Sequence, residues 1–153
     1  MDSSIVALKR EKRILLENYL NENLPRYETT FMENEDAVYA LDLDGHFLQI
    51  NPACEKILGI QVDQIGEITF QKLVPVDDLH RVFQNFHEAF EGKVQNHDYK
   101  IAKGGHHVYL NVTTLPIVVN DEVVGIYGIA KDITALKERN AKNRKEHRKF
   151  INY

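Results

Sequence analysis

The chain has 153 residues, of which 43% are hydrophobic and 27% are charged, and its net charge is −4. These values suit one soluble globular domain and exclude a chain that is disordered, collagen-like or coiled coil throughout. The single cysteine excludes a disulfide framework and a zinc site built on several thiolates. Because no apolar run approaches a membrane span and the N-terminus lacks a signal peptide's apolar core, we expect a cytoplasmic protein without membrane contact.

A helix is expected over residues 3–23, because apolar residues recur there at helical spacing and Pro25 lies just beyond. The apolar stripe must be buried either on this domain or on a second copy of it. Its members are Ile5, Leu8, Leu15, Leu16, Tyr19 and Leu20.

Residues 37–43 and 46–50 read as a β-hairpin, because Asp44-Gly45 between them suits a type I′ turn. Asn51-Pro52 then favours a helix start with Asn51 as its cap, and Gly59 ends that short helix. A longer helix is expected from Pro75 to Gly92. Its apolar side carries Leu79, Val82, Phe83, Phe86 and Phe90.

Three strands should close the domain, at about 94–102, 106–119 and 122–132, with turns at Gly104-Gly105 and Asn120-Asp121. Two-residue turns would place Tyr99 opposite Leu110 and Val112 opposite Ile129. The other face of the sheet, with Leu115, Ile117, Val124 and Ile126, needs a cover, for which the N-terminal helix is the obvious candidate. The core face would carry His97, Tyr99, Ile101, Val108, Leu110, Val112, Tyr127 and Ile129. This order of elements predicts an α+β fold with an antiparallel sheet.

Four segments in this order and spacing resemble a PAS sensor domain. They are Ala37–Gly45, Asn51–Gly59, Pro75–Leu79 and Val123–Thr134, which ends in Asp-Ile-Thr. The resemblance implies a five-stranded antiparallel sheet in the order 2-1-5-4-3, with helices on one face that enclose a pocket. The domain boundaries that follow are an N-terminal helix at 1–24, a PAS domain at 25–134 and a C-terminal signalling helix at 135–153.

Similarity to the PAS family implies a sensory module without catalysis of its own, covalently joined to an output domain. Its members precede histidine kinase, GGDEF (diguanylate cyclase), EAL (phosphodiesterase) or transcription-control modules. The closing residues 149–153 resemble the lead-in to a GGDEF module, which we favour slightly over a histidine kinase. An alternative of another class is a small α+β enzyme or carrier, which would need a titratable pair facing the core. His97 and Tyr99 are the candidates for that pair.

A ligand pocket is expected where the core face of the sheet meets the apolar side of the longer helix, because two apolar surfaces from separate elements meet there. The ligand would be small and apolar or mixed, and a solidly packed interior would instead indicate a protein-protein module. The expected lining is Phe83, Phe86, Tyr99, Leu110, Val112 and Ile129.

No metal and no cofactor are expected, and the alternative function within the family is a haem-binding or other cofactor-binding sensor. The haem branch of the family ligates iron through a histidine on the long helix, and only His87 lies near the phenylalanine side there. Cys54 lacks the asparagine-cysteine-arginine context of the flavin branch and a nearby base, so it reads as a buried small side chain. His97, His106 and His107 are too far apart in the expected register to share a metal.

Residues 132–153 are expected to transmit the signal from the sensory domain to the output module. Asp132 and Thr134 match the family's hinge between sensor and output, with Ile133 between them and Leu136 on the helix that follows. Residues 131–149 hold eight Lys/Arg and three Asp/Glu, but no aromatic interleaving, so we expect a solvated helix without nucleic-acid binding. Three of the six residues at its heptad positions are polar, which predicts a weak parallel homodimer that the N-terminal helix assists. The heptad positions are Ile133, Leu136, Asn140, Asn143, His147 and Phe150.

Overall fold

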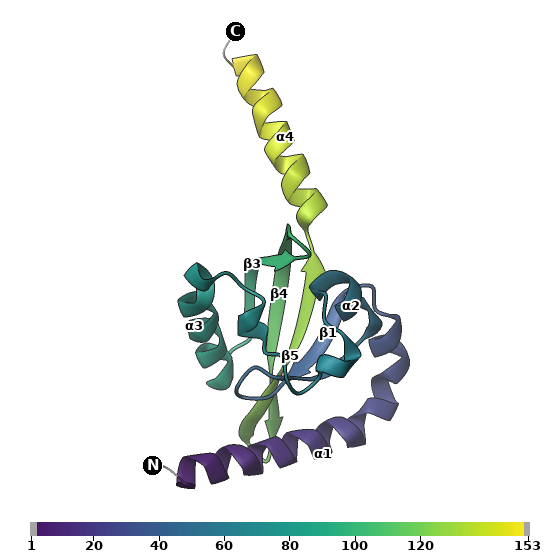
Figure 1. Cartoon of the computed structure of the whole chain (residues 1–153), viewed down its shortest axis with the longest axis vertical. Helices are drawn as coiled ribbons and strands as arrows, with labels where there is room; N and C mark the ends of the chain where they lie inside the picture. Colours follow the sequence, from purple (N-terminus) through teal and green to yellow (C-terminus); the bar gives the residue numbers. More distant parts are fainter. Residues whose placement is uncertain (1–2, 152–153) are drawn as a thin grey trace.

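A five-stranded antiparallel sheet forms the centre of the domain. Its strands are β1 (Ala37–Leu41), β2 (Phe47–Ile50), β3 (Gln95–Lys103), β4 (His106–Val119) and β5 (Glu122–Asp132). They pair in the order β2-β1-β5-β4-β3, which confirms the predicted topology and α+β class (Figure 1). The computed structural model describes the backbone of residues 3–151 and the side chains of residues 4–26 and 28–145.

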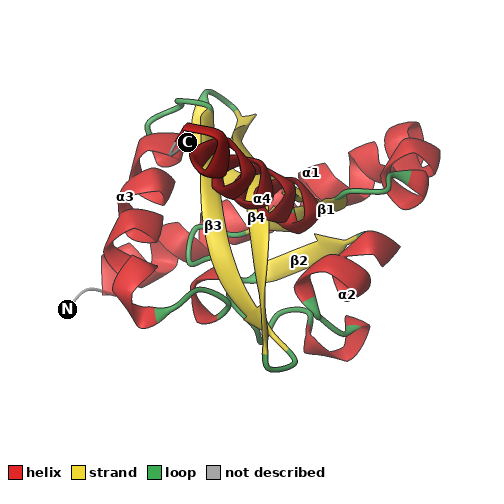
Figure 2. Cartoon of the chain, turned by 90° about the horizontal axis from the view of Figure 1, so that it is seen from above, coloured by secondary structure: helices red, strands yellow, loops and turns green. Residues whose placement is uncertain are grey.

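Helices cover both faces of the sheet. α2 (Pro52–Leu58) and α3 (Leu79–Phe90) pack on one face, called here the inner face. α1 (Ser3–Glu33) crosses the opposite, outer face (Figure 1). α4 (Thr134–Ile151) continues from β5, projects away from the sheet in Figure 1 and lies in front of it in the view from above (Figure 2). The segment between α2 and α3 contains three 3-10 turns, Val62–Gln64, Phe70–Lys72 and Val76–Asp78.

Two separate apolar clusters follow from this arrangement. The inner cluster joins α2 and α3 to the sheet and contains the largest buried rings, among them Tyr39, Phe47 and Phe70. The outer cluster is smaller, and Leu16 and Leu20 of α1 are its fully buried contribution from the helix. Each of these leucines stabilises the docked helix by about 1.5–3 kcal/mol. The predicted cover of the outer face by the N-terminal helix is therefore confirmed.

The first helix is longer than its sequence pattern predicts, because it continues through Pro25 to Glu33. A proline inside a helix removes one backbone hydrogen bond and crowds the preceding turn, so it bends a helix. Figure 1 shows that α1 bends between its first and second halves. Phe31 is buried beyond the bend, and Nδ2 of Asn51 donates to its carbonyl oxygen at 3.1 Å, which favours the continued helix. The expected boundary at residue 24 thus falls inside a helix.

The β3–β4 pairing is as predicted, with Tyr99 opposite Leu110. The β4–β5 pairing is not, because the register shifts between Ile117 and Val118. The predicted two-residue turn at Asn120-Asp121 does form, and both residues have positive φ, as a type I′ turn requires. Beyond the shift, Val112 faces Ala130 instead of Ile129.

From Ile126 onward the irregularity turns the side chains of β5 to the face opposite to the predicted one, whereas Val124 packs in the outer cluster as predicted. Because side chains alternate along a strand, a slip of one residue turns each of them to the opposite face. Ile126 and Ala130 therefore belong to the inner cluster, and Tyr127 packs against the outer one. The expectation that Tyr127 and Ile129 face the core, with Ile126 on the outer face, is wrong for this reason.

Candidate functional site

Aromatic rings fill the inner side of the sheet below α3. Phe70, from the second 3-10 turn, lies at the centre, with ring centroids 5.8 Å from Phe86 and Tyr99 and 6.1 Å from Tyr39. Such spacings are those of favourable aromatic pairs. Of the six residues expected to line a pocket, Phe86, Tyr99, Leu110 and Val112 lie in this cluster.

Two expected lining residues lie elsewhere. The side of α3 that is buried carries Val82, Phe86 and Ala89, and Phe83 is turned to solvent with 51% of its surface exposed. Ile129 lies on the outer face because of the β4–β5 register. The apolar side predicted from the helical wheel includes Phe83, but the helix is turned so that Asn85 and Ala89 are buried beside Val82 and Phe86. Phe70 was missed, since no periodic pattern marks the segment that contains it.

A polar pair interrupts the inner cluster between α3 and β3. Nδ2 of the buried Asn85 donates to the hydroxyl oxygen of Tyr99, and the Arg81 guanidinium lies 4.6 Å from the centre of the Tyr99 ring. Burial raises the pKa of Tyr99, while the Asn85 bond and the Arg81 charge oppose that rise. Tyr99 is therefore neutral, and its hydroxyl group is held in one orientation by Asn85. The periodicity of the sequence did not indicate Asn85 as its partner.

The histidine considered as a haem ligand does not reach the inner face. His87 is exposed, and its Nε2 lies 3.0 Å from Oε1 of Glu91 on the surface of α3. His106 and His107 are also exposed at the β3–β4 turn, whereas His97 is half-buried opposite Val112, where the register predicted it.

Within the described part of the chain, one group of side chains has the spacing of metal ligands. It consists of Asp42, Asp44 and His46 in the β1–β2 loop, whose ligating atoms lie within 4.8 Å of one another. Their oxygens already have basic partners on α1, because Arg13 Nη1 is 2.6 Å from Asp42 and Lys9 Nζ is 3.0 Å from Asp44. These ion pairs attach the first half of α1 to the loop. Lys9 and Arg13 are four residues apart and so lie on the same side of the helix. This spacing is the sequence feature that could have indicated one acidic loop as the partner of both.

Asn51 does not cap α2 as the sequence predicted. Its side chain makes no capping bond to α2. Oδ1 accepts from the backbone N–H of Val38 at 3.0 Å, and Nδ2 donates to the carbonyl oxygens of Phe31, Asn34 and Asp36. The buried amide therefore joins the end of α1 and the following loop to β1.

The junction between β5 and α4 is held by short hydrogen bonds. Oδ1 of Asp132 accepts from the N–H of Thr134 at 2.9 Å, at the start of α4. The hydroxyl oxygen of Thr134 accepts from the N–H of Tyr109 on β4 at 3.0 Å, and the N–H of Ile133 donates to the Tyr109 carbonyl oxygen at 2.8 Å. The strand and the helix are therefore joined by the chain and by bonds to the neighbouring strand. Leu136 is 47% exposed on α4, and His147 and Phe150 are outside the described side chains.

One ion pair fixes the first turn of α4 to the sheet. Lys137 Nζ lies 3.2 Å from Oδ2 of Asp98 on β3, and Nδ2 of Asn111 donates to the other carboxylate oxygen at 3.0 Å. The Asn111 bond, helped by the Lys137 charge, lowers the pKa of Asp98. The carboxylate therefore stays charged at neutral pH and can hold the lysine.

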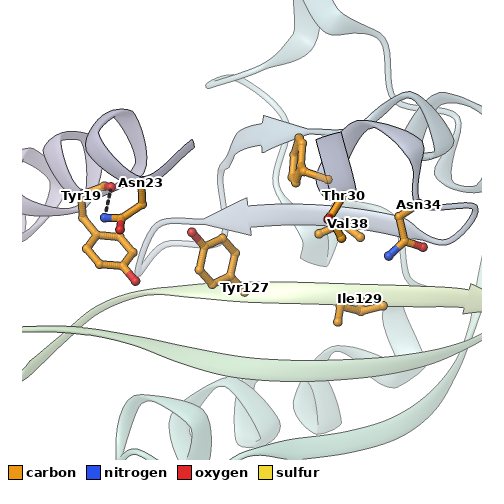
Figure 3. A pocket seen from close by; sticks show the side chains of 8 residues that line it. Tyr19, Asn23, Thr30, Asn34, Val38, Tyr127 and Ile129 are labelled. Atoms are coloured by element: carbon orange, nitrogen blue, oxygen red, sulfur yellow. Dashed lines mark hydrogen bonds between the residues drawn. The ribbon is translucent and has the colours of Figure 1, made fainter. Parts of the chain in front are cut away.

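A groove opens on the outer face, between α1 and strands β1 and β5. We call it the outer groove, and its volume is about 330 Å³. Figure 3 shows Tyr127 and Ile129 on β5 and Val38 on β1 along its floor, with Tyr19 and Asn23 at one end. The eight lining residues are Tyr19, Asn23, Thr30, Phe31, Asn34, Val38, Tyr127 and Ile129.

Comparison with known families identifies this architecture. The sequence model of the PAS fold matches residues 33–138, which include all five strands, α2 and α3. The chain belongs to the PAS family. The PAS sheet order and the Asp-Ile-Thr junction are both present, as the sequence resemblance implied.

Relatives of known identity support a signalling context. The PAS chain is 28% identical over 118 residues to the signaling protein YkoW of Bacillus subtilis, a match that covers 75% of this chain and 14% of YkoW. It therefore spans about one seventh of that relative. A PAS domain from Colwellia psychrerythraea superposes with a TM-score of 0.66 at 25% identity, covering 73% of this chain and 98% of that one. A domain of a sensory box histidine kinase/response regulator from Geobacter sulfurreducens, with a TM-score of 0.61 at 21% identity, covers 74% and 96% and shares the fold.

A helix that spans a membrane needs about 20 predominantly apolar residues. Over the described residues, no helix of this PAS chain is both long enough and apolar enough to cross a bilayer.

Proposed function

We propose that this PAS domain is a non-catalytic sensory module that binds a small ligand or a partner and passes the signal through α4 to an output module in the same chain. A GGDEF diguanylate cyclase is the output we favour slightly, with a histidine kinase next. The proposal includes no resident cofactor, and it keeps the cytoplasmic location expected from the sequence. The small match to a much longer signaling protein supports a module within a larger chain.

The observation that carries the proposal is the junction at Asp132 and Thr134. A movement of β5 must move α4, because the strand continues into the helix and the Thr134 hydroxyl is bonded to β4. Ile133 is 9% exposed, so the turn itself is packed and cannot absorb the movement freely. A sheet that tilts would therefore rotate or shift the helix that leads to the output module.

The proposal is tested in the full-length protein that contains this chain. Asp132→Ala removes the acceptor of the Thr134 N–H, and Leu136→Ala removes an exposed apolar side chain on α4. Both should uncouple output from the sensory domain, by at least fivefold in the ratio of stimulated to basal activity, and leave the amide spectrum of the sheet unchanged. Glu138→Ala, an exposed position two residues beyond Leu136, is the matched control. Normal signalling by both variants would mean that α4 is only a tether.

A further inference from the structure

The outer groove exists because α1 contacts the sheet at two places and rises between them. Leu16 and Leu20 are buried before the bend and Phe31 is buried after it. From residue 21 to residue 30 the described side chains are exposed or half-buried, and Pro25 lies within this stretch. The space beneath this part of the helix is the outer groove, on the face of the sheet opposite the aromatic cluster.

We propose that the outer groove binds an uncharged small molecule with an apolar, ring-sized body and a hydrogen-bonding group. This deepens the proposed function, since it names a class of ligand for the sensory module, and it rests on that function for its biological role. The inner face, where the family resemblance places a pocket, is not involved.

The lining determines the class of ligand. None of its eight residues is Lys, Arg, His, Asp or Glu, so a charged ligand would lose its hydration without gaining an ionic partner. Val38 and Ile129 supply an apolar floor beside the Tyr127 ring, while Asn23 and Thr30 bring amide and hydroxyl groups to the edge (Figure 3). An apolar surface with a few polar groups at its edge is typical of small-molecule sites.

The volume limits the size of the ligand. About 330 Å³ is at the lower end of ligand pockets, and at the volume of liquid water per molecule it holds roughly ten non-hydrogen atoms. A single six-membered ring with one small polar substituent fits this limit.

The groove also lies on the path to α4. Tyr127 and Ile129 belong to β5, and Ile129 is three residues before Asp132 at the junction. The opposite wall is α1, whose far end is held to β1 by the Asn51 amide. A molecule in the groove would touch both walls and so fix the distance between α1 and β5.

Benzamide and benzoate test the proposal, because they have the same size and shape and differ in charge. Each is titrated into the 153-residue chain labelled with ¹⁵N, and amide shifts are followed. We expect benzamide to move the amide signals of Val38, Asn34 and Ile129, and benzoate to bind at least tenfold more weakly. Equal binding of the two, no binding of benzamide, or shifts centred on Tyr99 and Leu110 of the inner face would overturn the proposal.

Two substitutions in the groove provide the second part of the test. Ile129→Trp fills the space and should weaken benzamide binding at least tenfold. Val118→Trp, at an exposed position on the same sheet but outside the groove, is the matched control and should bind like the wild type. Ile129→Ala shortens the side chain and introduces no steric clash, and it should weaken benzamide binding severalfold. The alanine variant therefore still tests the proposal if the tryptophan variant fails to fold. Unchanged binding by Ile129→Ala would overturn the proposal.

This experiment separates the groove from the proposed signalling role. Benzamide binding is read from the amide shifts of this chain, whereas coupling is read from output activity of the full-length protein. Binding that weakens severalfold in Ile129→Ala, together with normal signalling by Asp132→Ala and Leu136→Ala, would keep the site and reject the role of the junction.

Discussion

Cys54 lies in α2 with its sulfur 3.3 Å from the carbonyl oxygen of Val38 and 3.3 Å from Oδ1 of Asn51. The thiol S–H can donate to either oxygen. Burial raises the pKa of the thiol to about 12 and outweighs the opposing effect of the backbone hydrogen bonds at Asn51 and Val38. The thiolate is the reactive form of cysteine, and at pH 8 it would be roughly one part in ten thousand of this side chain. The helix start that could activate a thiol is therefore overridden by burial.

Alkylation of Cys54 by iodoacetamide at pH 8 should be at least a hundredfold slower in the folded protein than in urea, because unfolding restores both access and an ordinary pKa. The raised pKa of Cys54 also makes the stability of the folded protein depend on pH. Since the folded-state pKa is raised, the contribution of Cys54 to stability is complete below the unfolded pKa of about 8.5 and is lost as the pH rises toward 12.

Intact mass spectrometry measures the alkylation. Cys54→Ser removes the sole cysteine and should gain no mass, which assigns the reaction to this thiol. Equal rates for the folded and the unfolded protein would show that Cys54 is accessible and would contradict its burial.

At the scale of elements, β5 packs against the inner cluster on one face and against α1 on the other, and two glycines of the strand allow this close packing. Gly128 lies against the Tyr39 ring on the inner side, where an added Cβ would overlap the ring atoms. At Gly125 an added Cβ would lie 2.6 Å from a methyl carbon of Leu16 and 2.7 Å from the Leu41 carbonyl oxygen. α1 therefore approaches the strand closely because Gly125 has no side chain.

Replacing each glycine by alanine should give two different results. Gly128→Ala should destabilise the whole domain by about 1–3 kcal/mol or more, because the enclosed Tyr39 ring cannot move aside. Gly125→Ala should loosen α1, so that amide hydrogen exchange around Leu16 and Leu20 speeds up while exchange in β3 and β4 stays slow.

Urea unfolding and residue-resolved hydrogen exchange measure these two effects. Val123→Ala is a control on the same strand, because it shortens a half-buried side chain and introduces no overlap. A global loss of protection in Gly125→Ala, equal to that of Gly128→Ala, would mean that α1 and the sheet unfold as one unit.

The sequence predicts regular elements well and their irregular features poorly. The β3–β4 register and the ends of α2 followed from turn residues and period, which are local, whereas the sheet order followed from the resemblance to the PAS family. The register shift near Val118 could not be predicted, because the turn at Asn120-Asp121 sets the pairing only as far as Val118 and Val123, and no residue pattern marks the irregularity beyond them. The course of α1 beyond Pro25 depends on burial of Phe31 and on Asn51, which is twenty residues farther along the chain.

Of the two candidate sites, the one built from local features was predictable and the other was not. The Asp132 and Thr134 junction was predictable, since its hydrogen bonds lie within a short motif and a paired strand. The outer groove was not, because it is formed by a helix bend and by a strand face that the register shift reverses. Ile129 was named as a pocket residue, and it does line a cavity, but on the opposite face of the sheet from the one expected.

At the scale of the whole molecule, the two terminal helices carry the surfaces that could join two copies. The first half of α1 carries exposed apolar side chains. α4 projects from the other end of the sheet (Figure 1). Exposed apolar residues on one helix favour a partner surface when they are grouped. On α1, Ile5 and Leu8 lie three residues apart on one side of the helix and are 55% and 48% exposed, whereas the exposed Val6 and Ile14 lie on other sides.

We therefore predict a weak, concentration-dependent homodimer in which α1 contributes apolar contact, and the double substitution Ile5→Lys with Leu8→Lys should weaken its association at least tenfold. The positive charges would have to be buried, which costs more than the lost apolar contact. Sedimentation velocity distinguishes the 17.7 kDa monomer from a dimer. Met32→Lys, which is equally exposed at the other end of α1, is the matched control and should dimerise like the wild type. A wild-type chain that stays monomeric at millimolar concentration, or a double variant that dimerises normally, would show that these side chains do not form the interface.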